Sequence, residues 1–381
     1  MNYKIHDSDR HVIEPIEIWE QYVEKEVFEK YPVYLKTNKN TKGEELPAEY
    51  MIGSYPIVNY WTKSLQEESY LINKETLLQR HQAKTGFGQL QSMDLTNIAI
   101  ANIFPTFALG VIYHSEIPSY VAVAYAKAYN KWLNDYCNVN PKRLKAVGII
   151  NRHDPNEMIV QVIEVISYGW KTIILRPEEI NGRTLGHKDY EGFWEICTEN
   201  NISIAFHGGA HFHGKSVGTD RFNDRFSLLA TTHPFEIISA FISLLTSGVL
   251  ERYPTLKFAF LEAGSSWLPY WLWRLDTICY PDFPNQTKEN IKMLPSEYFK
   301  RQCWIAIEPG EPCLREVINI IGSNRLLFAS DFPHPDHEHL NSDDVPSKLP
   351  ELTDSELKEI FELNAREFFN YEEEHEHANY N

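Results

Sequence analysis

The sequence predicts an α/β fold, a (β/α)₈ or TIM barrel, in which eight parallel strands alternate with helices. Eight short apolar runs recur along the 381 residues, mostly separated by stretches with helical periodicity. Most runs are almost continuously apolar, as expected for parallel strands buried on both faces. The expected strands are residues 3–7, 97–104, 145–150, 171–176, 202–207, 256–262, 302–308 and 325–331.

The expected helices follow these strands in order. Apolar residues at helical spacing predict helices over 119–137, 155–168, 189–199, 235–252 and 266–279. Asp154 is a good N-cap for the second of them. Thr353 and Glu356 form a capping box, which predicts a final helix from Thr353 to about residue 369. Residues 1–370 are therefore interpreted as one barrel domain, and 371–381 as a polar, frayed tail.

Residues 32–91 do not follow the alternation. They are rich in Lys, Asn, Glu and Tyr, and they are too long for an ordinary strand-to-helix connection. We predict an insertion over the carboxyl end of the barrel that serves as a cap, a lid or an oligomer arm. Tyr60, Trp61 and Tyr70 are candidate pocket or interface aromatics, and local packing of the insertion is an equally good interpretation.

The composition argues against several classes of protein. With 36 Lys and Arg against 53 Asp and Glu, the net charge is −17, which disfavours binding to nucleic acid or to an anionic membrane. No apolar stretch approaches the roughly 20 residues of a membrane span, and no signal peptide is visible. The five cysteines lack a Cys-x-x-Cys pair, which indicates reduced thiols rather than disulfides. These features predict a cytoplasmic protein.

Acidic and imidazole side chains stand at the ends of the expected strands. Asp9 and His11 lie just beyond the first strand and two residues apart, so both can point the same way. His207, Glu262 and Asp331 end the fifth, sixth and eighth strands, and barrel active sites lie at such ends. Two imidazoles with carboxylate oxygens suit one divalent metal ion, with Zn²⁺ expected first and Mn²⁺ or Fe²⁺ as alternatives. The alternative is a set of satisfied structural polar groups.

Other residues near the strand ends are candidates for substrate contact. Arg176 and Arg183 could bind a substrate carboxylate bidentately, or form ion pairs within their loop. His334 could orient the substrate or simply pack in its turn. His233 is expected near the N-cap of a helix and could face the pocket.

The loop after the fifth expected strand holds further candidates for the pocket. These are His211, His213 and Arg221.

Several motifs together resemble the amidohydrolase-related group of the amidohydrolase superfamily, which includes aminocarboxymuconate-semialdehyde decarboxylase. The resemblance covers nearly the whole chain and is specific for the family, but it says less about the reaction. The motifs are DSDRHVIEP at 7–15, LRP at 175–177, NGR at 181–183, FHGG at 206–209, HPFE at 233–236, FLEAGSSWLPY at 260–270 and SDFPH at 330–334.

The resemblance implies roles for matching residues. Asp9, His11, His207 and Asp331 would bind the metal, and Asp331 would also carry the proton of metal-bound water. Where the decarboxylase has a catalytic histidine after its sixth strand, this chain has Glu262. Its role stays open among base, metal contact and substrate acceptor.

Three functional hypotheses follow. The first is a metal-dependent hydrolase that acts on an amide, cyclic amide, lactone or similar carbonyl compound through metal-activated water. The alternative is a metal-dependent non-oxidative decarboxylase, a lyase, of an aromatic or unsaturated carboxylic acid. The third is a binding protein that kept the barrel without catalysis, which the four candidate ligands argue against. The expected partner is a small-molecule substrate. The family resemblance and the aromatic-rich residues 267–280 also suggest a homodimer, although these aromatics could equally belong to the core.

Overall fold

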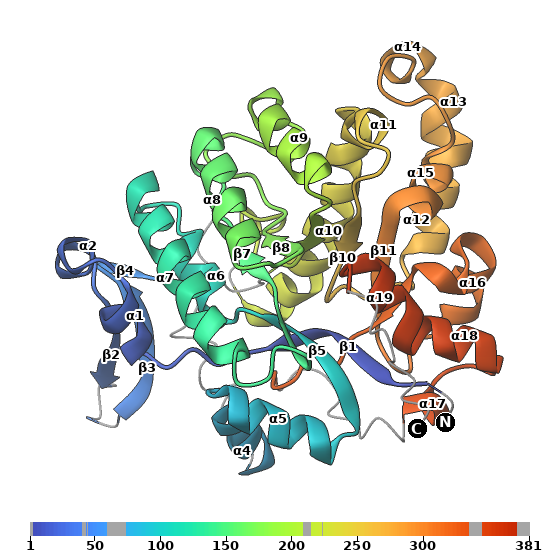
Figure 1. Cartoon of the computed structure of the whole chain (residues 1–381). Coiled ribbons are helices and arrows are strands. Elements are labelled where there is room, and N and C mark those ends of the chain that lie inside the picture. The colour runs from blue at the N-terminus through green and yellow to red at the C-terminus, as the bar shows by residue number, and fades with distance from the viewer. Residues whose placement is uncertain are drawn as a thin grey trace, which may run out of the picture.

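The computed structural model describes residues 3–39, 43, 45–58, 74–208, 215–222, 224–334 and 345–371. Within them, parallel strands are surrounded by helices (Figure 1). The larger sheet has the strand order β12–β11–β10–β9–β8–β7, and the smaller has the order β1–β5–β6. Their strands are β1 (Ile5–His11), β5 (Ile98–Phe104), β6 (Leu144–Ala146), β7 (Gly148–Ile149), β8 (Thr172–Leu175), β9 (Ser203–Phe206), β10 (Phe258–Phe260), β11 (Cys303–Ile307) and β12 (Leu326–Phe328).

Each of the eight apolar runs contains a strand, and the third contains two. Val147 alone separates β6, which pairs with β5, from β7, which pairs with β8. At the other edges, Asp331 N–H donates to the Asp9 carbonyl at 3.0 Å, and His11 N–H donates to the Phe332 carbonyl at 2.7 Å. The two parallel sheets therefore approach each other at both edges.

The first predicted strand was placed too early. β1 begins at Ile5 and continues to His11, and all seven of its residues are buried. The polar residues after Ile5 do not end the strand, because buried groups elsewhere in the fold form hydrogen bonds with them. Asp7 accepts hydrogen bonds from Ser330 N at 2.9 Å and from Arg10 Nη1 at 3.2 Å.

Most of the helices predicted from the spacing of apolar residues are confirmed. α7 has the predicted bounds, and α8 is capped by Asp154, whose side chain accepts from Asn156 N. The final helical stretch begins with the predicted capping box and includes a π turn over Glu359–Leu363. The helices are α1 (Glu17–Tyr22), α2 (Lys25–Lys30), α4 (Lys74–Gln82), α5 (Gly86–Leu95), α6 (Phe107–Ile112), α7 (Ser119–Cys137), α8 (Pro155–Ser167), α9 (Glu191–Glu199), α10 (Arg225–Thr246), α11 (Val249–Arg252), α12 (Leu268–Arg274), α13 (Tyr280–Asp282), α14 (Pro284–Thr287), α15 (Pro295–Gln302), α16 (Leu314–Ile321), α17 (Val345–Lys348), α18 (Asp354–Lys358) and α19 (Asn364–Phe368).

α10 corrects two expectations. It begins at Arg225 rather than at 235, because Asp224 caps it and Pro234 lies inside it. The added turns make Phe226–Thr246 long and apolar enough to cross a membrane by length and composition, contrary to the expectation of no such stretch. More than half of this segment is buried inside the protein, as in a core helix.

The segment between β1 and β5 contains a third sheet. β2 (Val33–Lys39), β3 (Glu45–Ile52) and β4 (Tyr55–Pro56) make a small antiparallel sheet, which lies beside α1 and α7 at the left of Figure 1. Tyr50 of this sheet stacks on Phe107, just beyond β5, with ring centroids 4.8 Å apart. Its function as a cap stays a prediction, and Tyr60, Trp61 and Tyr70 lie outside the described residues.

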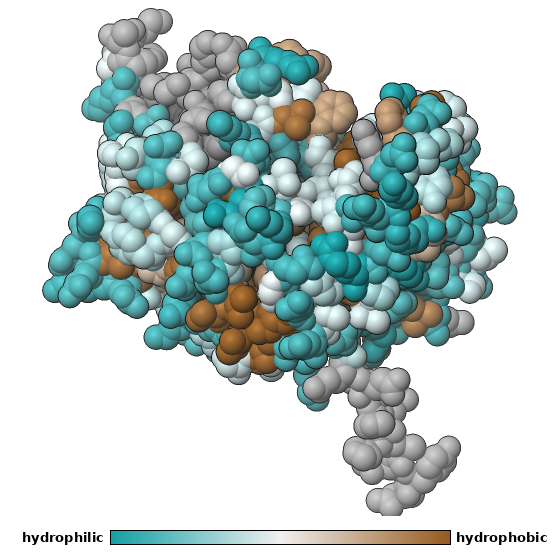
Figure 2. Space-filling model, turned by 90° about the horizontal axis from the view of Figure 1, so that it is seen from above, coloured by the Kyte–Doolittle hydropathy of each residue, from teal (hydrophilic) through white to brown (hydrophobic). Residues whose placement is uncertain are grey.

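The remaining expectations from composition concern the cysteines and the molecular surface. All five cysteines are free thiols, and three of them are buried. Seen from above, the surface is mostly hydrophilic, with hydrophobic residues in separate areas (Figure 2).

We predict that Asp7→Ala lowers the free energy of unfolding by about 3–5 kcal/mol, because it leaves the buried Arg10 guanidinium without its carboxylate. Chemical denaturation measures the loss. The control is Asp220→Ala, which removes an exposed acid paired with Arg221 and should change stability by less than about 0.5 kcal/mol. Equal effects of the two substitutions would contradict the prediction.

Candidate metal centre

Five side chains from four strands converge on one point. One ligand atom from each of Asp9, His11, His207, Glu262 and Asp331 lies within 4.8 Å of all the others. Four of them are the predicted metal ligands, and the fifth is the acid whose role the sequence left open. The structure therefore brings together all five residues selected at the strand ends.

The backbone fixes these positions. Asp9 and His11 lie on β1, and His207 directly follows β9. Glu262 and Asp331 have φ values of 56° and 50°, in the left-handed region that such residues seldom adopt. A conformation of this kind costs roughly 1–3 kcal/mol and persists only where its surroundings enforce it.

The two imidazoles face each other through their Nε2 atoms, which are 3.1 Å apart. The Nδ1 atom of His11 lies 2.8 Å from the Pro105 carbonyl, and that of His207 lies 2.7 Å from the Gly208 carbonyl. A carbonyl only accepts, so each Nδ1 carries a hydrogen, and in the neutral ring each Nε2 has a lone pair. Two such lone pairs repel unless a proton or a cation lies between them.

The carboxylates show the same need for a cation. Both oxygens of Asp9 are buried and accept no hydrogen bond from the described residues. Oδ1 of Asp9 and Oδ1 of Asp331 each lie 3.2 Å from Nε2 of His11. Desolvating a carboxylate without compensation costs several kcal/mol. A divalent cation would compensate both acids, and the nitrogen and oxygen donors suit Zn²⁺, Mn²⁺ or Fe²⁺.

The electrostatics of the centre follow from this crowding. Burial works against charge on His11, but Asp9 and Asp331 hold the pKa of this imidazole well above its ordinary value. Burial also works against charge on His207. The carboxylates of Glu262 and Asp9 outweigh this effect and raise the pKa of this imidazole. Burial would raise the pKa of Glu262, yet His207 and His233 hold it below its usual range. Without a cation, the imidazoles therefore retain protons.

Two further histidines border the centre. His334 Nδ1 is 2.8 Å from Asp331 Oδ1, and its ring centroid is 4.2 Å from that of His11. His233 Nε2 is 3.4 Å from Glu262 Oε2. The expectation that His233 precedes a helix was wrong, because it lies inside α10, directly before Pro234. Its side chain nevertheless faces the centre.

The predicted arginines are held in their loops. Arg176 is buried, and its Nε lies 3.1 and 3.2 Å from the two carboxylate oxygens of Glu178. Arg183 Nε lies 3.0 Å from Asp189 Oδ2. These are the loop ion pairs of the alternative interpretation, and contact with a substrate carboxylate stays a prediction for both arginines.

The loop after β9 contributes little to the described centre. Arg221 is three-quarters exposed and pairs with Asp220. His211 and His213 lie outside the described residues.

Two supporting acids were missed as parts of the centre. Asp7 accepts from both N and Oγ of Ser330, which ties the start of the Asp331 turn to β1. Glu14 accepts from the backbone N–H groups of Thr106, Phe107 and Ala108 at the start of α6. The sequence could have indicated the role of Asp7, because Arg10 follows it by three residues and a buried arginine needs an acidic partner.

Thr106 connects this support to the centre. Its hydroxyl lies 3.0 Å from His334 Nε2, while its N–H is held by Glu14. His334 is thereby fixed between Thr106 and Asp331.

Comparison with known proteins identifies the family. The amidohydrolase pattern matches residues 80–371, which is more than half of the chain. The chain therefore belongs to the amidohydrolase family, a class of enzymes, as its motifs predict.

Individual relatives are more distant. The chain is 22% identical over 242 residues to 2-amino-3-carboxymuconate-6-semialdehyde decarboxylase of Dictyostelium discoideum, covering 62% of this chain and 65% of that protein. The chain thus spans slightly less than two thirds of this relative's length.

Solved structures show the same fold. An amidohydrolase from Mycobacterium avium subsp. paratuberculosis K-10 superposes with a TM-score of 0.75 and 22% identity, covering 97% of this chain and all of that one. 5-Carboxyvanillate decarboxylase from Novosphingobium aromaticivorans, solved with bound manganese, superposes with a TM-score of 0.71 and 17% identity, covering 97% and 98%.

We predict that Asp9→Ala weakens binding of Mn²⁺ or Zn²⁺ by more than about 100-fold, since even groups that only orient a ligand contribute about 10–100-fold. Equilibrium dialysis with elemental analysis measures the affinity. His187→Ala removes a half-exposed imidazole outside the centre and should leave it unchanged. Unaltered affinity of the Asp9 variant would contradict the assignment.

We also predict that metal binding releases protons and strengthens as the pH rises. The raised pKa values of His11 and His207 keep these imidazoles protonated toward neutral pH, so protons compete with the cation. Calorimetric titration of the metal in buffers with different ionisation enthalpies counts the released protons. Observed heats that do not depend on the buffer would refute this prediction.

Proposed function

We propose that this protein is a metal-dependent decarboxylase that removes carbon dioxide from an aromatic or unsaturated carboxylic acid. The sequence expectation ranked hydrolysis first, and this order is reversed. The observation that carries the proposal is the buried centre of two imidazoles and three carboxylates, bordered by His233 and His334. The decarboxylases among the relatives support it, one by sequence and one by a fold that holds manganese.

A cavity beside the centre supports a ring-shaped substrate. Its volume is about 460 Å³, within the range of small-molecule sites. Its polar lining includes Glu262, His233 and two further acids, Glu308 and Glu311. Apolar residues, among them Leu229, Pro234 and Trp267, form much of the rest. An aromatic or conjugated acid fits such a mixture, with its carboxylate toward the centre.

The chain's own residues can carry the proton that the reaction needs. The carbon that loses the carboxylate gains one proton, its bond to the carboxylate carbon breaks, and carbon dioxide leaves. Asp331 and His334, with 2.8 Å between Oδ1 and Nδ1, can hold and replace that proton. A bound divalent cation would supply the positive charge that holds the substrate carboxylate.

His233 is the proposed substrate contact. It lies in the wall of the cavity, and its Nε2 is 3.4 Å from Glu262. It therefore supplies an imidazole near the end of the sixth strand, where Glu262 stands in place of the family's histidine. We infer that Glu262 orients His207 and His233 through its charge.

The proposal extends to barrel closure, the identity of the cation and the assembly of the protein. We propose that the two parallel sheets form one closed (β/α)₈ barrel, on the strength of the hydrogen bonds between β1 and the Asp331 turn. Mn²⁺ and Zn²⁺ are the proposed cations. A homodimer, a cytoplasmic location and the absence of nucleic-acid or membrane binding stay predictions, and exposed Tyr270 and Trp273 fit the proposed dimer surface.

Hydrolysis is the second candidate. It is favoured by Glu262, because a carboxylate there does not reproduce the imidazole of the decarboxylase. Asp331 would then take a proton from water instead of giving one to carbon.

The test is carbon dioxide release from a panel of hydroxybenzoates and unsaturated acids, compared with hydrolysis of amides and lactones by the same Mn²⁺- or Zn²⁺-loaded protein. We expect release of carbon dioxide, and a fall in kcat of roughly 10²–10⁴-fold in His233→Gln at unchanged metal content. His187→Gln is the matched control. Hydrolysis without carbon dioxide release would establish the second candidate instead.

A further inference from the structure

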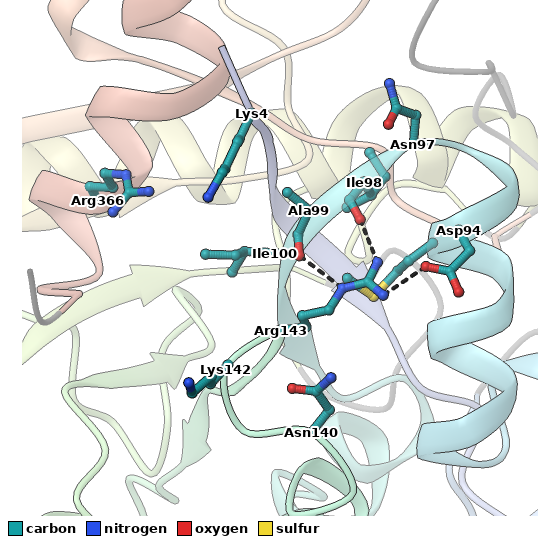
Figure 3. Close-up of a pocket in the computed structure, with 11 residues that line it drawn as sticks. Lys4, Asp94, Asn97, Ile98, Ala99, Ile100, Asn140, Lys142, Arg143 and Arg366 are labelled. Carbon is teal, nitrogen blue, oxygen red and sulfur yellow. Dashed lines mark hydrogen bonds and ion pairs between the residues drawn. The ribbon is translucent and has the colours of Figure 1, made fainter. Parts of the chain in front are cut away.

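The opposite end of the strands carries a second cavity. It has a volume of about 530 Å³ and lies where β1, β5 and β6 begin (Figure 3). Lys4 precedes β1, whereas Asp9 and His11 lie in its last three residues. The cavity is therefore remote from the metal centre, and it belongs to neither the centre nor the proposed substrate pocket.

One arginine builds the wall of this cavity. Arg143 donates from Nε to the Ala99 carbonyl at 3.1 Å and from Nη2 to the Ile98 carbonyl at 2.8 Å. Its Nη1 lies 2.6 Å from Asp94 Oδ1. Figure 3 shows these contacts across the start of β5. The charges of Arg143 and Asp94 offset each other, and the hydrogen bonds fix the shape of the wall.

Other cations face the same space. Figure 3 shows Lys4, just before β1, and Arg366 of α19 on one side of the cavity, and Lys142 on the loop before β6. Arg366 lies 3.4 Å from Glu362. Neither Lys4 nor Lys142 makes a side-chain ion pair within 4.0 Å of an acid in the described parts of the chain. Their two charges are therefore available to a ligand.

The basic surface continues into an adjoining cavity. This cavity, of about 480 Å³, shares Ile100, Lys142 and Arg366 with the first and adds Lys145 and Lys171. None of the described residues that line it is acidic. Six cations and one acid, Asp94, line the two cavities, in a chain whose net charge is −17. Two of the six are paired, Arg143 with Asp94 and Arg366 with Glu362. Solubility alone does not account for such a concentration of positive charge.

A buried histidine experiences this positive field. His6 on β1 is fully buried, and burial lowers its pKa to about 3, with Arg366, Lys4 and Lys145 acting in the same direction. Three of the cations that line the cavities thus act together on one residue of β1.

We propose that these two cavities form a binding site for a small multivalent anion, a molecule with two or more phosphate or carboxylate groups. Each cavity has the volume of a small-molecule site, and concave walls strengthen the field of the cations. The ligand bridges β1, the loop before β6 and α19. This site does not depend on the proposed decarboxylase function.

The test is calorimetric titration of the metal-loaded full chain with inorganic triphosphate and, separately, with tricarballylate. The two probes distinguish phosphate from carboxylate recognition. We expect binding of at least one probe, weakened about tenfold or more in the double variant Lys4→Gln, Lys142→Gln. The matched control Lys25→Gln, Lys188→Gln loses the same charge elsewhere and should bind as the unaltered protein does.

The comparison between variants locates the site. A probe that binds the metal does so equally in all three proteins, so the difference reports only the basic cavities. Unchanged circular dichroism spectra and unfolding midpoints would show that the variants fold. Equal affinity of the unaltered protein and the Lys4, Lys142 variant would overturn the proposal.

A chain that ends at Tyr371 tests whether the acidic residues after it compete with the probes. The sequence after Tyr371 contains four glutamates, which carry the same kind of charge as the probes. If neither the full chain nor this shortened chain binds either probe, the proposal is wrong.

Discussion

The structure depends on the need to neutralise negative charge at one buried point. Three carboxylates and two imidazoles meet there, with the Nε2 atoms of His11 and His207 only 3.1 Å apart. Their desolvation is unfavourable unless a cation or protons lie between them. This cluster of buried charged groups therefore destabilises the folded protein by itself and becomes favourable when a cation binds. Binding of the cation and stability of this end of the strands are consequently linked.

A set of buried acids outside the centre keeps this arrangement in place. Asp7 binds Arg10 and Ser330, and Glu14 binds the backbone at the start of α6. Through these contacts the first strand is fixed both to the Asp331 turn and to the loop after β5. Asp9 and Asp331, which are more than 300 residues apart in sequence, are therefore held together by long-range hydrogen bonds to the first strand.

The two ends of the strands differ in charge. Acids gather at the carboxyl ends around the metal centre, while lysines and arginines line the cavities at the amino ends. Since β1 reaches from one to the other, ligands at the two sites would contact the same strand. This separation of charge would keep the proposed cation and anion sites from neutralising each other.

The sequence by itself determined the strands, most helices and the residues that meet at the candidate metal centre. Apolar runs, N-caps such as Asp154 and strand-end acids are local signals. It did not determine that β1 continues beyond Asp7 to His11, since burial of Asp7 and Arg10 requires Ser330 and Ser92 from distant segments. Likewise, His233 was expected near the N-cap of a helix, but α10 begins at Arg225 and brings His233 to Glu262. Only the tertiary structure decided these points, because partners of buried polar groups are chosen across the fold and not along the chain.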